Sequence, residues 1–455
     1  MLKEQEIHRA VVTGFTSEGL GVCRVDGCAV FVPNAAPDEE YDLRITHVGK
    51  HAAYGSILRI ITKSPSRVNR KCPHAGLCGG CTFWHLTYAA ELELKAQRVL
   101  DALNRIGGQS LAEVPITGAQ SCEGYRNKAQ YPVATAKKGL AAGFFRKGTH
   151  RVIPVQRCLI QSPCADRAVA AVLQWARQCG VTAYDETSGK GLLRHIFVRC
   201  AAATGQVLVC PVINGASLPE PALLVSLLRQ RVAGLASVQV NYNTKRGNTV
   251  LGPTTRVLWG QEAIEDVLCG LRFRISPASF YQVNRDQAER LYNAALTAAK
   301  LDGTQTVLDL YCGTGTITLC AAKRAKQAIG VEVVAAAIAD AEENARRNGI
   351  TNARFFCADA GQAAQKLTQE GVRPDVIIVD PPRKGVSADV IDAIERMSPQ
   401  RLVYVSCDPA TLARDVALLC ADGWQLEHAE AFDLFPRCAH VETVVLMTRT
   451  DAGKG

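Results

Sequence analysis

Alternating apolar and polar positions dominate the first sixty residues of the chain. The segment VVTGFTSEGLGVCRVDGCAVFVP, residues 11–33, alternates in this way with glycines at its turns, and YDLRITHV and AYGSILRII follow. This period of two is typical of short strands. About five such strands predict a small β-barrel of the oligonucleotide-binding (OB) kind over residues 1–62. A generic barrel without a ligand has the same pattern.

The period changes after the barrel. Residues 88–108 (YAAELELKAQRVLDALNRIGG) carry apolar side chains at helical spacing and end in two glycines, which predicts one amphipathic helix. Farther on, LLRHIFVRCAAATGQVLVCPVI and similar stretches predict the strand pairs of an antiparallel sheet. We expect a central α+β domain over residues 63–265, whose helix near residues 88–106 is a candidate for packing on the C-terminal domain.

Residues 266–455 repeat a unit of strand, turn and helix. TVLDLYCGTGTITLCAAKRA, DVIIVDPPRKGV and RLVYVSCDPATLARDVALL each run from an apolar strand into a turn and a helix. Alternation of this kind predicts a parallel sheet covered on both faces, with ligands at the carboxyl ends of the strands. The fold class is therefore α/β, with a Rossmann-like C-terminal domain.

Positive charge is concentrated in one region. The chain has a net charge of +9, but residues 63–160 alone hold 15 Lys and Arg against five acidic residues. Such a region suits a polyanion such as nucleic acid, although a solvated basic face is an equal alternative. Candidates for phosphate contacts are Arg126, Lys128, Lys137, Lys138, Arg146 and Lys147, and candidates for base stacking are Tyr131, Phe144 and Phe145.

Composition points to the cytoplasm. No apolar stretch approaches the roughly 18 residues that span a bilayer, and the start, MLKEQEIHRA, lacks the core of a secretory signal. We expect a cytoplasmic monomer with no membrane and no obligate protein partner. Because a reducing compartment keeps thiols free, the 18 cysteines do not predict disulfides, and isolated ones such as Cys200 are expected to be buried thiols.

One group of cysteines differs. Cys72, Cys78 and Cys81 form a C-x5-C-x2-C pattern in KCPHAGLCGGC, whose glycines allow tight turns around a common centre. This spacing predicts a metal site. The fourth ligand remains open between Cys158 and Cys164, and His74 and His85 compete with them, so that zinc is an alternative to an iron–sulfur cluster.

A nucleoside-containing cofactor is indicated by the first strand of the repeat. Asp309 opens the turn DLYCGTG, and Glu332, 23 residues later, ends the next strand, where a carboxylate can accept both ribose hydroxyls. The third glycine of the dinucleotide fingerprint is missing, which favours S-adenosylmethionine over NAD. Asp359 is placed to meet the adenine amino group, and Asp380 ends the fourth strand.

Cys407 is the candidate nucleophile. It follows a strand and opens a helix in SCDP, where the helix dipole is expected to stabilise a thiolate. Uracil C5 is too poor a nucleophile to accept a methyl group unaided, but thiolate addition at C6 activates it. A base must then remove the C5 proton, and Glu442 is the best candidate, with His440 second. The target base must be unpaired or flipped out of its stack.

These motifs together resemble the iron–sulfur 23S ribosomal RNA uracil-C5 methyltransferases over essentially the whole chain. The matching segments are the TRAM-like barrel EGLGVCRVDGCAVFVP, C-x5-C-G-G-C with Cys158, YRNKAQYPV, SFYQVN, DLYCGTGT, VDPPRKG, SCDPATLARD and HVETVVLM. The resemblance implies a [4Fe-4S] cluster on Cys72, Cys78, Cys81 and Cys158. It also implies S-adenosylmethionine contacts from Gln282, Tyr311, Thr316, Glu332, Asp359 and Asp380, and catalysis by Cys407 and Glu442 on single-stranded or flipped-out 23S RNA.

Two alternatives remain at this point. Transfer-RNA uracil-C5 methyltransferases share the catalytic loops, but they typically lack the cluster cysteines and the barrel. A non-catalytic, cluster-bearing RNA-binding protein is the second alternative. The intact residues Glu332, Asp380, Cys407 and Glu442 argue against it.

Overall fold

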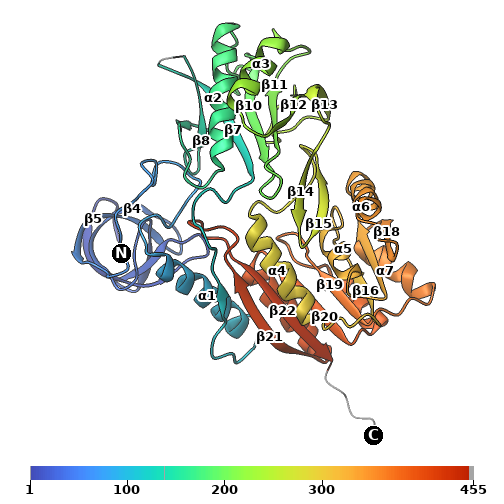
Figure 1. Ribbon diagram of the computed structural model, residues 1–455. Coiled ribbons are helices and arrows are strands. Elements are labelled where there is room, and N and C mark those ends of the chain that lie inside the picture. The colour runs from blue at the N-terminus through green and yellow to red at the C-terminus, as the bar shows by residue number, and fades with distance from the viewer. Residues whose placement is uncertain (1, 138, 450–455) are drawn as a thin grey trace.

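The computed structural model describes residues 2–137 and 139–449 and arranges the strands in three large sheets and one two-stranded ribbon (Figure 1). The first sheet is a closed barrel in the order β1-β2-β3-β5-β4. Its strands are β1 (Ile7–Phe15), β2 (Gly21–Val25), β3 (Cys28–Val32), β4 (Glu40–Val48) and β5 (Ala53–Thr62). The alternating pattern therefore encloses a small core that includes Val30 and Leu43, as predicted.

A seven-stranded sheet follows in the order β13-β12-β11-β10-β7-β8-β9, and only its β11–β12 pair is parallel. Helices α2 (Pro163–Gln178) and α3 (Pro221–Arg231) pack together against it. Its strands are β7 (Lys128–Ala136), β8 (Gly139–Phe145), β9 (Val152–Pro154), β10 (Leu193–Cys200), β11 (Val207–Ile213), β12 (Leu235–Tyr242) and β13 (Thr254–Gly260). The ribbon of β14 (Ile264–Leu268) and β15 (Leu271–Ile275) leads to the last sheet.

The third sheet has the order β18-β17-β16-β19-β20-β22-β21-β6, with the first five strands parallel and β22 inserted antiparallel between β20 and β21. This is the predicted Rossmann-like arrangement. Its strands are β16 (Thr306–Asp309), β17 (Gln327–Glu332), β18 (Ala353–Cys357), β19 (Val376–Val379), β20 (Arg401–Ser406), β21 (Trp424–Phe432), β22 (Glu442–Arg449) and β6 (Ile116–Thr117).

Helices cover both faces of this sheet (Figure 1). They are α4 (Arg285–Ala298), α5 (Thr316–Ala322), α6 (Ala335–Arg347), α7 (Ala360–Gln369), α8 (Ala388–Met397) and α9 (Pro409–Ala421). Helix α1 (Tyr88–Arg105) packs on α9, and its Val99 and Leu103 are buried in the core of that face. The layers of the C-terminal domain therefore include α1, which precedes the seven-stranded sheet in the chain.

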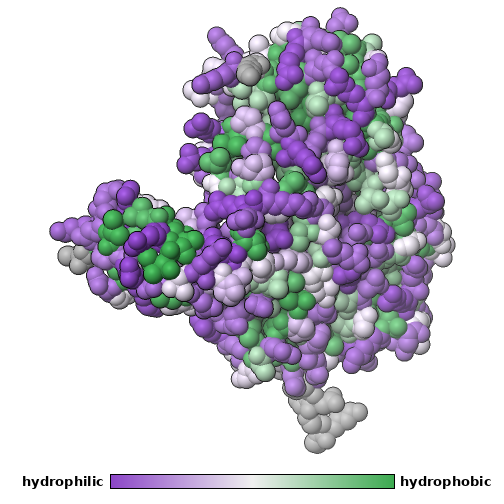
Figure 2. All heavy atoms as spheres, turned by 60° about the vertical axis from the view of Figure 1, so that its left-hand side comes forward, coloured by the Kyte–Doolittle hydropathy of each residue, from purple (hydrophilic) through white to green (hydrophobic). Residues whose placement is uncertain are grey.

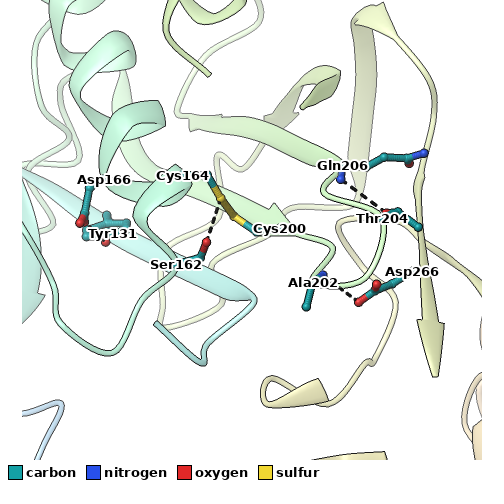
Figure 3. The surroundings of a disulfide bond; sticks show 9 residues. All are labelled: Tyr131, Ser162, Cys164, Asp166, Cys200, Ala202, Thr204, Gln206 and Asp266. Atoms are coloured by element: carbon teal, nitrogen blue, oxygen red, sulfur yellow. Dashed lines mark hydrogen bonds between the residues drawn. A yellow bond between two sulfur atoms is a disulfide. The ribbon is translucent and has the colours of Figure 1, made fainter. Parts of the chain in front are cut away.

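Cys164 and Cys200 form a disulfide that joins the start of α2 to the end of β10 (Figure 3). The expectation that Cys200 is a buried free thiol is therefore wrong. Both residues flank the segment before β7, because Ser162 N donates to Arg126 O at 3.2 Å and Cys200 N donates to Asn127 O at 2.8 Å. Neighbouring backbone hydrogen bonds thus bring together two cysteines that are distant in sequence.

The barrel projects from the rest of the molecule and carries apolar side chains on the face seen in Figure 2. Exposed apolar residues on its strands include Ile7, Val11, Tyr54 and Leu58. No helix within the described ranges is long and apolar enough to cross a membrane.

Candidate active site and cysteine cavity

The glycine turn after β16 is held against the end of β17. Gly313 N donates to Glu332 Oε2 at 3.3 Å, and Val334 N donates to Glu332 Oε1 at 2.9 Å. Gly313 and Gly315 both adopt positive φ, which glycine tolerates without a Cβ penalty. The carboxylate of Glu332 is therefore fixed beside a turn whose backbone a ligand can approach.

Asp309 is a buried carboxyl group beneath this turn. It accepts hydrogen bonds from Thr318 Oγ1 at 2.7 Å and from Tyr311 N at 3.3 Å. Burial raises its pKa to about 6, and the nearby charge of Glu332 adds to the effect. Asp309 thus ties the first turn of α5 to the strand end.

Three residues predicted to contact the methyl donor, Gln282, Thr316 and Asp380, lie around Tyr292, which the sequence analysis missed. The hydroxyl of Tyr292, on α4, accepts from Thr316 Oγ1 at 3.5 Å. Its pKa is raised by burial and by the charge of Asp380, while hydrogen bonding with Thr316 and Gln282 opposes that rise. The only sequence signal for Tyr292 was its place on the apolar face of a helix.

The other two predicted contacts lie near one another. Burial raises the pKa of Tyr311 to about 12, and the carboxylates of Asp359 and Asp415 contribute. Asp359 also caps α7, because its Oδ1 accepts from Gly361 N at 3.0 Å. Tyr311, Glu332, Asp359 and Asp380 therefore lie at the carboxyl ends of parallel strands, whereas Thr316 begins α5 and Gln282 precedes α4.

Cys407 and Glu442 are brought together by the antiparallel pairing of β20 with β22. Ser406 and Thr443 are paired across the two strands, so that Cys407, just after β20, stands beside the register position of Glu442, which begins β22. Two residues that are 35 positions apart thus meet at one edge of the sheet.

The Cys407 thiol is not stabilised as a thiolate in the free protein. Burial raises its pKa to about 11, and the charges of Glu442 and Asp380 raise it further while Arg383 opposes them. Asp408 caps α9, accepting from Ala410 N at 2.9 Å and Thr411 N at 3.2 Å, so that its side chain meets these helix amides. The direction of this pKa shift is opposite to the thiolate stabilisation expected from the helix dipole.

Glu442 is buried, and Asp380 is half-buried and close enough for its charge to act on Glu442. Burial and the charge of Asp380 raise the pKa of Glu442 to about 8, and burial with the charge of Asp309 raises that of Asp380 to about 7. His440, the second candidate base, lies 3.5 Å from Arg383 Nη2 through its Nε2. Desolvation and the charge of Arg383 lower the pKa of His440 to about 4, which makes it a weak base.

Four cysteines line one cavity of about 270 Å³ in the central region: Cys72, Cys78, Cys81 and Cys158. His74 lines it as well. His85 does not, because its Nε2 lies 2.8 Å from Ala35 O beneath the barrel, and Cys164 is bonded to Cys200. Two of the competing ligands are therefore excluded by position. Within residues 2–137 and 139–449, no three His, Cys, Asp or Glu side chains are grouped closely enough to hold a metal ion.

Positive charge surrounds the cysteine cavity. Arg126, Lys128 and Arg157 line it, and Arg126 Nε is buried without a hydrogen-bond partner in the described part of the chain. Burial and the charges of Arg199 and Arg126 lower the pKa of Lys128 to about 8. Arg126 and Lys128 are half-buried, whereas Arg157 is exposed and its charge acts on Asp166.

The predicted stacking residues differ in accessibility. Tyr131 is fully buried and donates to Asp166 Oδ1 at 3.0 Å, so it is unavailable to a base. Phe144 packs on Tyr131 with ring centroids 4.7 Å apart, and Phe145 stacks on His150. Lys137, Arg146 and Lys147 are exposed, and Lys138 lies outside the described residues. The sequence analysis missed Phe280, which is 63% exposed beside Gln282.

Comparisons with known proteins agree with this geometry. Residues 254–450 match the family described as tRNA (Uracil-5-)-methyltransferase. An uncharacterized RNA methyltransferase of Caldanaerobacter subterraneus is 42% identical, with 98% of this chain and 99% of that protein covered, and another of Halalkalibacterium halodurans is 40% identical with 98% of both covered. The crystal structure of the Pyrococcus abyssi tRNA (uracil-54, C5)-methyltransferase with S-adenosyl-L-homocysteine has a TM-score of 0.79 at 26% identity and covers 97% of this chain and 100% of that one.

The last comparison corrects one sequence-based argument. We expected transfer-RNA enzymes to lack the barrel, yet the match to the Pyrococcus abyssi enzyme extends over nearly the whole chain. Full-length architecture therefore does not separate ribosomal-RNA from transfer-RNA substrates.

Proposed function

The chain belongs to the tRNA (uracil-5-)-methyltransferase family of S-adenosylmethionine-dependent RNA methyltransferases, and we propose that it methylates C5 of a uridine in 23S ribosomal RNA as a monomer. The observation that carries the chemistry is the adjacency of Cys407 and Glu442 at the sheet edge where the predicted donor residues gather. The choice of 23S RNA is supported by the resemblance of the motifs and by the four-cysteine cavity.

In the proposed reaction, the sulfur of Cys407 adds to uracil C6 and converts C5 into an enolate carbon, while the thiol proton passes to solvent or to a neighbouring carboxylate. When bound, S-adenosylmethionine supplies the methyl group that C5 accepts. Glu442 then takes the C5 proton, the C5–C6 double bond re-forms and the bond from C6 to sulfur breaks. A pKa of about 8 suits Glu442 to this role near neutral pH.

We further propose that Cys72, Cys78, Cys81 and Cys158 hold a [4Fe-4S] cluster. The proposal is supported by four thiols that line one cavity together with Arg126, Lys128 and Arg157, whose positive charges suit a negatively charged tetrathiolate centre. Gly80 N also donates to Cys78 Sγ at 3.4 Å, which is the kind of amide contact such sulfurs receive. When bound, the cluster would link residues 72–81 to the turn that carries Cys158.

A transfer-RNA uridine is the second candidate substrate, because the Pyrococcus abyssi enzyme with that activity matches nearly the whole chain. Methylated uridines should be mapped in both 23S and transfer RNA from cells with and without the gene. Loss of a C5-methyluridine from 23S RNA alone supports the proposal. Loss from transfer RNA alone rejects it in favour of the second candidate.

A further inference from the structure

The loop that leads into Glu442 is held by a distant part of the chain. This base loop, residues 433–441, connects β21 to β22. We propose that Arg437 is a positioning residue that fixes the base loop, and with it Glu442, on the cysteine-bearing segment and helix α1. This inference rests on the proposed role of Glu442. Four sets of contacts carry the proposal.

The first set involves the backbone of Arg437. Its carbonyl oxygen accepts from Thr82 N at 2.6 Å and from Phe83 N at 3.0 Å, the two amides directly after Cys81. Arg437 has a φ of 71°, a conformation that is rare outside glycine and persists only where the surroundings impose it. The base loop is therefore anchored on the cysteine segment at its least favourable backbone position.

The second set involves α1 and the segment before it. Arg437 N donates to Glu91 Oε1 at 2.6 Å, and its Nη1 donates to Leu86 O at 3.1 Å and to Glu91 Oε2 at 3.3 Å. The guanidinium also lies over the ring of Trp84, 5.1 Å from its centroid. The side chain of Arg437 thus connects the base loop to residues 84–91.

The third set fixes the two ends of the base loop. Lys95 Nζ lies 2.7 Å from both Glu91 Oε1 and Asp433 Oδ1, and all three side chains are almost completely buried. Near the other end, Arg98 Nη1 donates to Ala439 O at 2.9 Å. Helix α1 therefore holds the base loop both before and after Arg437. The second of these contacts, at Ala439, is three residues from Glu442.

The fourth contact joins the base loop to the cysteines. Cys438 Sγ donates to Gly80 O at 3.1 Å and lies beside the thiol of Cys81. The segment that bears the cysteines and the loop that carries the base are consequently one hydrogen-bonded unit. Cys407 is outside this unit, because it follows β20 and precedes Asp408, which caps α9.

Because Arg437 orders the loop of Glu442 and not the position of Cys407, its loss should slow proton removal while adduct formation continues. Arg437→Gln is compared with wild type and with a control, Arg105→Gln, at an exposed arginine of helix α1. In vitro transcribed 23S RNA and a transfer-RNA transcript serve as probes. We expect product formation to fall about 10- to 100-fold in Arg437→Gln, with more enzyme trapped as a denaturant-resistant RNA adduct and unchanged affinity for S-adenosylhomocysteine.

Arg437→Lys keeps the charge opposite Glu91 and should restore part of the rate, and Arg98→Gln should reproduce the adduct excess in a milder form. The proposal is overturned if Arg437→Gln turns over like Arg105→Gln, or if it loses the adduct and the product together. A wild-type enzyme that forms neither product nor adduct on either transcript rejects the proposed function itself, which is a separate outcome.

Discussion

Glu442 lies buried beside the carboxylate of Asp380, and burial together with that negative charge raises the pKa of Glu442 to about 8. A base must be ionised to accept a proton, so proton removal from the adduct should become faster as pH rises toward 8. Single-turnover measurements should show a release rate that increases about tenfold per pH unit below the pKa and then levels off. A rate that stays constant between about pH 6 and 8 would remove Glu442 from this role.

The same pKa has a consequence for stability. Glu442 has a folded pKa of about 8 against an ordinary value of 4.5, so the folded chain binds this proton more tightly than the unfolded chain does. Its contribution to the free energy of unfolding is therefore present below about pH 4.5 and is lost as the pH rises through 8. Glu442→Gln should raise the thermal midpoint by about 5 °C near pH 9 and by much less near pH 5.

Differential scanning calorimetry of wild type, Glu442→Gln and the exposed control Glu427→Gln measures this effect. A midpoint difference between wild type and Glu442→Gln that is equal at both pH values contradicts the assignment of the raised pKa. The same variant should accumulate the RNA adduct, because a neutral amide cannot take the C5 proton.

Glu332 should control affinity for the methyl donor. Its two oxygens accept from Gly313 N and Val334 N, and in the proposed site they also meet the ribose. Glu332→Gln should weaken the binding of S-adenosylhomocysteine about 10- to 100-fold, which is the usual cost of losing a charged hydrogen-bond acceptor. Isothermal titration with Glu342→Gln, an exposed residue of α6, provides the control. Equal affinities for the two variants would mean that Glu332 only orders the turn.

The lining of the cysteine cavity predicts which cysteines are needed to bind the metal. Cys158→Ser should lose most of the bound iron and the brown colour of the purified protein, whereas Cys164→Ser and Cys179→Ser should retain both. Assays on anaerobically purified protein measure the iron and the acid-labile sulfide bound per chain. A colourless wild-type protein that contains zinc is the result that defeats the cluster assignment.

The sequence allowed prediction of the features that local pattern controls. Period-two alternation led to the barrel, and the repeated strand, turn and helix led to the parallel sheet whose carboxyl ends hold Glu332 and Asp380. The thiolate expected at Cys407 is opposed by burial of the thiol and by the charges of Glu442 and Asp380, which the SCDP motif does not reveal.

Contacts between segments that are distant in the chain could not be predicted from the sequence. Arg437 and Glu91 are 346 residues apart, and no periodicity relates them, so the base loop could be recognised only from the packed structure. The Cys164–Cys200 bond and the burial of Tyr131 have the same origin, since each depends on which strand lies beside which helix.

The most direct measurement concerns the bond between the Cys407 sulfur and uracil C6. Wild type, Cys407→Ala and the control Cys179→Ala should be incubated with S-adenosylmethionine and each transcript, and both methylated uridine and covalent RNA–peptide adducts quantified by mass spectrometry. We expect Cys407→Ala to form neither while it still binds S-adenosylhomocysteine, and any adduct in the other two proteins to map to Cys407. Formation of C5-methyluridine by Cys407→Ala at the rate of Cys179→Ala would contradict the account.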